Sequence, residues 1–417
     1  MWSGFWCFVF VVSEWSDWVQ GQYRLAQGFE PYRSDDLYWS VYSLSVAGLA
    51  FGFTLLAKRL SWNALRWFGL SAWCALGWSS FVMLADLYVN EGMSERETWW
   101  AYFALWGVCE WLMAFWRKMD WSIDSLWLKT LHSQRIIVPW LMIWPVGRRL
   151  IEYWLGSETS GEQALLSEAG WFTSGSWGRY LPAWLMMLAI FWVIRRARGE
   201  VWPTFPIATW YQRTLIPLGT AWSIILVFWW NLTQNGLMEP LPYLPVLNPL
   251  DLTTGFAVIL GIESYRYLCE GFDESEQRPD WLAKAPWIAA LAGYAWFNLM
   301  LLRTVAAYLP IPYQIDPLYD SQFVQTMLSL VWSGTALVLM RVAAQRNLRK
   351  IWMLGALLLG IVVAKLFLVD LSNVGGLERV ISFVGVGLLM LAIGYLAPLP
   401  SESVEAVGER PSTPPKI

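Results

Sequence analysis

Charged side chains inside long apolar stretches are the residues of this sequence best suited to do chemistry. Glu110 lies in ALWGVCEWLMAFW, and Lys365 lies in LGIVVAKLFLVDL. Because a charge at the centre of a bilayer costs a few kcal/mol, such residues are candidates for a binding site or an ion pathway. Glu110 could pair with a basic group, relay a proton or reach the inner interface, and we favour the last. Lys365 could extend to the membrane surface or point into the bundle toward a carboxylate of another helix.

A pair of arginines, Arg148 and Arg149, forms a second candidate binding group. The pair directly follows WPVG, where Pro145 and Gly147 predict a break or a bend in the helix. Two adjacent guanidinium groups near the membrane surface suit a phosphate or an anionic headgroup. An ordinary interfacial anchor is the alternative for this pair, and the same two interpretations apply to Arg303.

Three acidic residues, Glu30, Asp35 and Asp36, cluster in GFEPYRSDD on the predicted outer side. Membrane glycosyltransferases that use polyprenyl-linked sugars often keep an acidic pair in the first outer loop, where it holds a metal ion or acts as a base. On this analogy the three residues are weak catalytic candidates. Solvated charges at the start of a helix are the alternative, and we favour it.

Two similar motifs place an Asn or an Asp directly before a proline, in YLPVLNPLDL and in YLPIPYQIDPLYD. Asn248 and Asp316 are typical of helix N-caps or of turns, and a proline suits the first helical turn because no amide donor is needed there. The functional alternative is an outward-facing cleft between the two loops, with Asp251, Asp316 and Asp320 as its polar groups.

The segments that precede the two motifs are also similar, with FWWNL before the first and WFNLM before the second. The sequence therefore predicts a two-span unit that occurs twice in the same orientation, near 214–268 and 285–340. Internal repeats of this kind are common in transporters.

Composition shows which elements must position these residues. Of the 417 residues, 57% are hydrophobic and only 15% are charged, whereas soluble domains carry roughly 25% charged residues. Apolar blocks of about 20 residues match the length of a membrane-spanning helix. We expect an all-α, polytopic bundle of about twelve transmembrane helices over residues 1–397, with a disordered polar tail at 398–417. The expected spans lie near 2–12, 37–57, 64–86, 98–116, 136–155, 180–194, 214–231, 250–268, 285–303, 322–340, 351–370 and 380–397.

The distribution of Lys and Arg orients this bundle. If the spans alternate from an inner N-terminus, most basic residues fall on the inner side, as the positive-inside rule expects. We therefore predict that both termini are cytoplasmic. The segment 117–135 alternates apolar and charged residues at helical intervals, which predicts an amphipathic helix on the inner surface with His132 exposed at its end.

Several function classes find no support in the sequence. The net charge of −3 is unlike that of a nucleic-acid-binding protein. The four cysteines are dispersed and His132 is the single histidine, so neither a disulfide framework nor a metal site is expected. No nucleotide-binding loop occurs in a credible context, and we expect no cofactor.

Several stretches of the C-terminal half resemble a bacterial family of membrane proteins known as domain-of-unknown-function family 2339. The resemblance is carried by FVQTMLSLVWSGTALVLM, KLFLVDLS, RVISFVGVGLLMLAIGYLAPLP and LPYLPVLNPLDL. It is clearest over 229–400 and weaker upstream, as if the chain were a short member or the C-terminal part of a longer one. The resemblance implies a location in the bacterial inner membrane, and no activity.

Three functions remain open on this basis. The first is transport or flipping of an amphipathic envelope substrate, such as a lipid or a lipid-linked glycan, and we favour it. The second is a glycosyltransferase-like envelope enzyme, and the third is a membrane scaffold without chemistry of its own. The lipid bilayer is the expected partner in each case.

Overall fold

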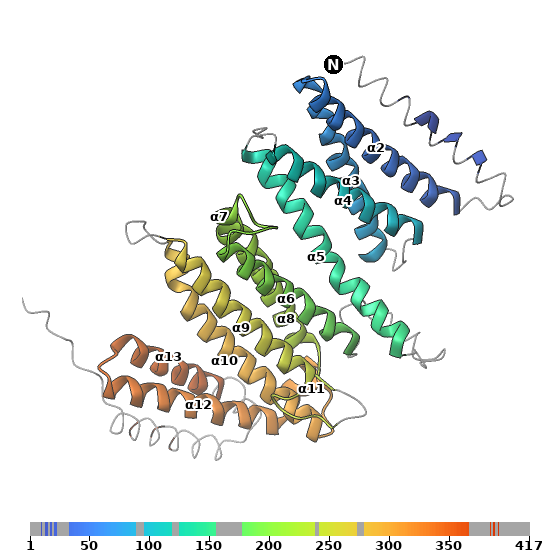
Figure 1. Cartoon of the computed structure of the whole chain (residues 1–417). Helices are drawn as coiled ribbons and strands as arrows, with labels where there is room; N and C mark the ends of the chain where they lie inside the picture. Colours follow the sequence, from blue (N-terminus) through green and yellow to red (C-terminus); the bar gives the residue numbers. More distant parts are fainter. Residues whose placement is uncertain are drawn as a thin grey trace, which may run out of the picture. The chain divides into compact units, whose positions relative to one another are not determined.

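The computed structural model in Figure 1 describes residues 33–88, 96–118, 125–155, 177–237, 242–272 and 279–366, with a few further positions near both ends. Within these ranges all regular structure is helical, which confirms the all-α fold class. The longer helices are α2 (Arg33–Arg59), α3 (Gly69–Tyr88), α4 (Arg96–Lys118), α5 (Ser125–Leu155), α6 (Trp177–Arg198), α8 (Ile216–Thr233), α9 (Pro249–Glu270), α10 (Asp280–Tyr308), α12 (Gln322–Gln345) and α13 (Arg349–Lys365). The short ones are the 3₁₀-helix η1 (Asn63–Phe68), α7 (Ala208–Trp210), the π-helix η3 (Tyr211–Leu215) and α11 (Ile315–Asp320).

Each expected span from 37–57 to 351–370 coincides with one of these helices. The first and last expected spans, 2–12 and 380–397, lie almost wholly outside the described residues, and so does the tail. Six of the described helical stretches are long and apolar enough to cross a membrane. The multi-pass helical architecture is therefore confirmed.

The chain divides into two compact units, Met1–Leu291 and Ala292–Ile417, and the division falls within α10. The first unit contains two apolar cores, one among α2–α5 and one among α5, α6, α8 and α9. Helix α5 contributes Leu131 and Met142 to the first core and Trp144 to the second. In Figure 1, α5 runs between these two groups of helices. A helix that is apolar on several faces is expected at such a position.

In the second unit, α12 packs along α13 around Ala336, Met340 and Leu359. Gly355 allows the two helices to approach closely, because a Cβ atom at this position would lie 2.7 Å from Met340 Cγ. Small residues serve the same purpose at many helix contacts in membranes.

The expected surface helix over 117–135 is wrong. Helix α4 extends to Lys118, and α5 begins at Ser125 and continues without interruption to Leu155, past Pro139 and Pro145. Prolines are tolerated within membrane helices because neighbouring groups satisfy the freed backbone carbonyls. The residues 125–135 are therefore the first turns of a long helix.

The two predicted N-caps have different outcomes. The side chain of Asn248 accepts a hydrogen bond from the Asp251 amide at 2.9 Å and caps α9, as expected. Asp316 is not an N-cap, because α11 already begins at Ile315 after an extended Gln314. Ser321, rather than Asp316, caps the membrane helix α12 that follows.

Candidate functional site

Helices α4 and α5 bring Glu110 and Arg135 together as a buried ion pair. The distance from Arg135 Nε to Glu110 Oε1 is 3.2 Å, and the two side chains are 3% and 16% exposed. Glu110 thus pairs with a basic group, one of the three roles considered for it. Arg135, which the sequence had placed at the inner surface, lies inside the protein.

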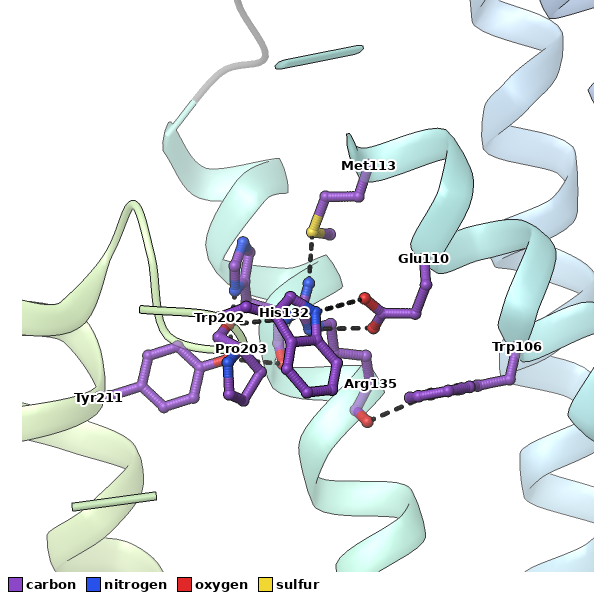
Figure 2. Close-up of polar contacts among 8 residues, drawn as sticks. All are labelled: Trp106, Glu110, Met113, His132, Arg135, Trp202, Pro203 and Tyr211. Carbon is purple, nitrogen blue, oxygen red and sulfur yellow. Dashed lines mark hydrogen bonds and ion pairs between the residues drawn. The ribbon is translucent and has the colours of Figure 1, made fainter. Parts of the chain in front are cut away.

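The segment after α6 closes over this pair (Figure 2). Trp202 Nε1 donates a hydrogen bond to Glu110 Oε2 at 3.0 Å, and Arg135 Nη2 donates to the Pro203 carbonyl at 2.6 Å. Arg135 Nη1 contacts the sulfur of Met113 at 2.7 Å, which is a weak acceptor. The ion pair therefore connects α4, α5 and the segment that follows α6.

His132 lies one turn before Arg135 on α5 and is completely buried, so the expectation of a surface histidine is wrong. Its Nδ1 lies 3.1 Å from the hydroxyl of Tyr211, which is also completely buried. Burial, together with the nearby Arg135 guanidinium, lowers the pKa of His132 to about 3. His132 is therefore neutral at physiological pH.

Tyr211 is placed by the π-helix η3, which lies directly before α8. Gln212, the next residue of η3, donates a hydrogen bond to the Tyr267 carbonyl of α9 at 2.7 Å. Single π-turns of this kind are frequent at functional sites. Nothing in the local sequence predicts the π-turn, so Tyr211 was missed as a site residue.

A cavity of 610 Å³ extends from the ion pair between α4, α5, α6 and α8. This volume lies within the usual range of about 300–1,000 Å³ for small-molecule sites. The lining side chains are mostly aliphatic or Trp, and Glu110 and Arg135 are the only charged residues among them. Three of the lining side chains, Trp192, Leu218 and Trp222, are 42%, 60% and 51% exposed, so the cavity is open along α6 and α8. The result is an apolar groove with one polar end.

Two other candidates from the sequence, Asp251 and Lys365, have local polar partners. The Asp251 carboxylate accepts hydrogen bonds from Asn248 Nδ2 at 2.5 Å and from the Val246 amide at 3.1 Å, within the cap of α9. Lys365 Nζ lies 2.8 Å from Ser329 Oγ on α12, so it points toward a neighbouring helix. Arg303 is completely buried.

None of the remaining candidates is among the described residues that line the cavity. Asp316 is exposed on α11, in the second unit. Arg148 and Arg149 lie in α5, and Asp35 and Asp36 lie in the first turn of α2, but these four side chains are outside the described part. Glu30 is outside it altogether. Among the described residues, no group of three His, Cys, Asp or Glu side chains could hold a metal ion.

Comparison with known protein families gives a match over most of the chain. The model of a family described as "Predicted membrane protein (DUF2339)" matches residues 1–400. The likeness therefore extends well upstream of the C-terminal stretches that carry it in the sequence. No curated protein and no solved structure shows a significant match.

Proposed function

The chain belongs to the DUF2339 family of membrane proteins, and on this premise we propose that it binds an amphipathic envelope substrate within the bilayer, as a transporter or flippase must. The single observation that carries the proposal is the half-open apolar cavity with the Glu110–Arg135 pair at one end. An amphipathic molecule has the same distribution of polarity, with one polar end and a long apolar body.

The exposed side of the cavity supports entry from the membrane. Leu218 and Trp222 on α8 and Trp192 on α6 are large apolar side chains that would be costly to expose to water. In a bilayer they face lipid tails instead. A chain-bearing substrate could then enter sideways and keep its apolar part out of water throughout.

Gly219 offers a direct test, because it lines the cavity on α8. A Cβ atom at Gly219 would lie 3.3 Å from Ile190 Cδ1 and 3.9 Å from Trp140 Cζ2. Gly219→Phe should therefore fill the cavity. A Cβ atom at Gly255, in α9, has no atom of the described structure within 4 Å, so Gly255→Phe is the matched control.

The measurement is native mass spectrometry of the full chain, extracted gently from its own membranes. We expect an amphipathic species of discrete mass to co-purify with the unmodified protein and with Gly255→Phe, and to be lost from Gly219→Phe. Bulk phospholipid alone, equal in all three proteins, would contradict the proposal and favour the scaffold function.

A further inference from the structure

The polar end of the cavity contains a pair of atoms whose hydrogen-bonding capacity is not used. Arg135 Nε and Glu110 Oε1 are 3.2 Å apart, but neither atom makes an aligned hydrogen bond with any described residue. The other carboxylate oxygen, Oε2, accepts from Trp202, and the terminal nitrogens of Arg135 contact Pro203 and Met113. This donor and this acceptor therefore face each other as an ion pair beside the cavity, covered by the surrounding atoms and without an aligned hydrogen bond. Buried polar groups in proteins nearly always have partners, so this arrangement points to a group from outside the chain.

The charge of this end limits the kind of group that fits. Glu110 and Arg135 cancel each other, and the other lining side chains carry no charge. A phosphate or carboxylate headgroup would be attracted by Arg135 and repelled by Glu110, and the reverse holds for an ammonium headgroup, so neither gains net electrostatic energy from the neutral pair. A buried charge without its own partner is costly, so both charged classes are disfavoured.

We infer that the cavity takes a neutral amphiphile with a hydroxyl-bearing headgroup, such as a long-chain glycerol ether, a monoacylglycerol or a neutral glycolipid. A hydroxyl group is both a donor and an acceptor. It accepts a hydrogen bond from Arg135 Nε and donates one to Glu110 Oε1, after a small separation of the pair. The alkyl chain then lies along the apolar walls of α5, α6 and α8. This inference rests on the proposed function and adds the substrate class to it.

Three probes with the same alkyl chain test the substrate class: 1-hexadecylglycerol, hexadecyl phosphate and hexadecylamine. Each is titrated onto the purified full chain in detergent, and bound probe is counted by native mass spectrometry. We expect the glycerol ether to bind about tenfold or more tightly than either charged probe, which corresponds to about 1.4 kcal/mol. Equal or tighter binding of a charged probe would overturn the inference and leave the proposed function standing. Binding of none of the three probes would overturn both.

Three variants show where and why the probes bind. Gly219→Phe should abolish binding of the glycerol ether, and Gly255→Phe should leave it unchanged. Glu110→Gln removes the negative charge and leaves Arg135, so the preference should shift toward hexadecyl phosphate by about tenfold. An unshifted preference in a folded Glu110→Gln protein would contradict the role of the pair. If this variant does not fold, the comparison of probes on the unmodified protein still decides the question.

Discussion

At the scale of single residues, the Glu110–Arg135 pair stabilises the protein only while both members are present. Arg135→Gln leaves the Glu110 carboxylate largely buried without its partner, and losing one member of a buried pair costs about 3–5 kcal/mol. We expect a clearly lower thermal unfolding midpoint in detergent for this variant. The double variant with Glu110→Gln should lose less than Arg135→Gln alone, because no buried charge remains. Strictly additive losses would show that the two side chains do not interact.

Any effect of histidine protonation on the stability of the folded state comes from His132, because it is the only histidine in the sequence. Burial, Arg135 and Arg117 disfavour the charged imidazole, the Pro203 backbone favours it, and no carboxylate of the described residues contributes. With the folded pKa lowered to about 3, the unfolded chain takes up a proton below pH ~6.5 and the folded chain does not. The histidine contribution to stability is therefore constant above pH ~6.5 and falls by up to about 1.4 kcal/mol per pH unit between pH ~6.5 and ~3.

Thermal unfolding between pH 7.5 and pH 5 checks this expectation against His132→Gln, which cannot be protonated. The unmodified protein should lose more stability on acidification than the variant. An equal loss in both proteins would show that His132 is already protonated in the folded state.

Of Glu110, Arg135 and His132, the sequence alone pointed only to Glu110 as a site residue. Glu110 could be identified because it interrupts an apolar stretch, where a charge is costly. Arg135 and His132 could not, because the polar residues around them gave the pattern of a surface helix. Their burial follows from the position of α5 between two apolar cores. That position depends on contacts with distant segments, which a local pattern does not contain.

At the scale of the helices, the two Asx-Pro-Leu motifs provide a matched comparison. Asn248 caps α9 and exchanges hydrogen bonds with Asp251, so Asn248→Ala should lower the free energy of unfolding by about 1 kcal/mol. Asp316→Ala, at an exposed position in the first turn of α11, should change it by less than about 0.5 kcal/mol. Chemical or thermal unfolding of both variants in the same detergent makes the comparison. A larger loss for Asp316→Ala would mean that the second motif also fixes a helix start.

The same comparison shows what local sequence can specify. Both motifs have the residues of an N-cap, and only the first acts as one. In the second, the chain enters a helix before Asp316, and Ser321 supplies the cap of α12. The π-helix at Tyr211–Leu215 is a further case, because it is held by the contact of Gln212 with α9 rather than by its own residues.

At the scale of the whole molecule, hydropathy was sufficient to predict the fold class and most of the helices. The reason is physical, since an apolar block of membrane-spanning length has few alternatives to a helix in a bilayer. The cavity could not be predicted in this way. The cavity depends on how α4, α5, α6 and α8 are rotated about their axes. When a helix is apolar on several faces, its hydropathy does not show which face points toward its neighbours.

The orientation of the first unit in the membrane is the last prediction. The distribution of basic residues predicts that the turn after α6 lies on the inner side and the turn after α8 on the outer side. Glu200 and Asn235 are exposed in these two turns, with α8 between them. In a variant without the four native cysteines, Asn235→Cys in intact cells should react with a membrane-impermeant maleimide, and Glu200→Cys should react only after lysis. The opposite result would invert the topology and place the Glu110–Arg135 end of the cavity in the outer half of the membrane. Labelling of both positions from one side would mean that α8 does not cross the bilayer, and a lateral entrance along α8 would then be excluded.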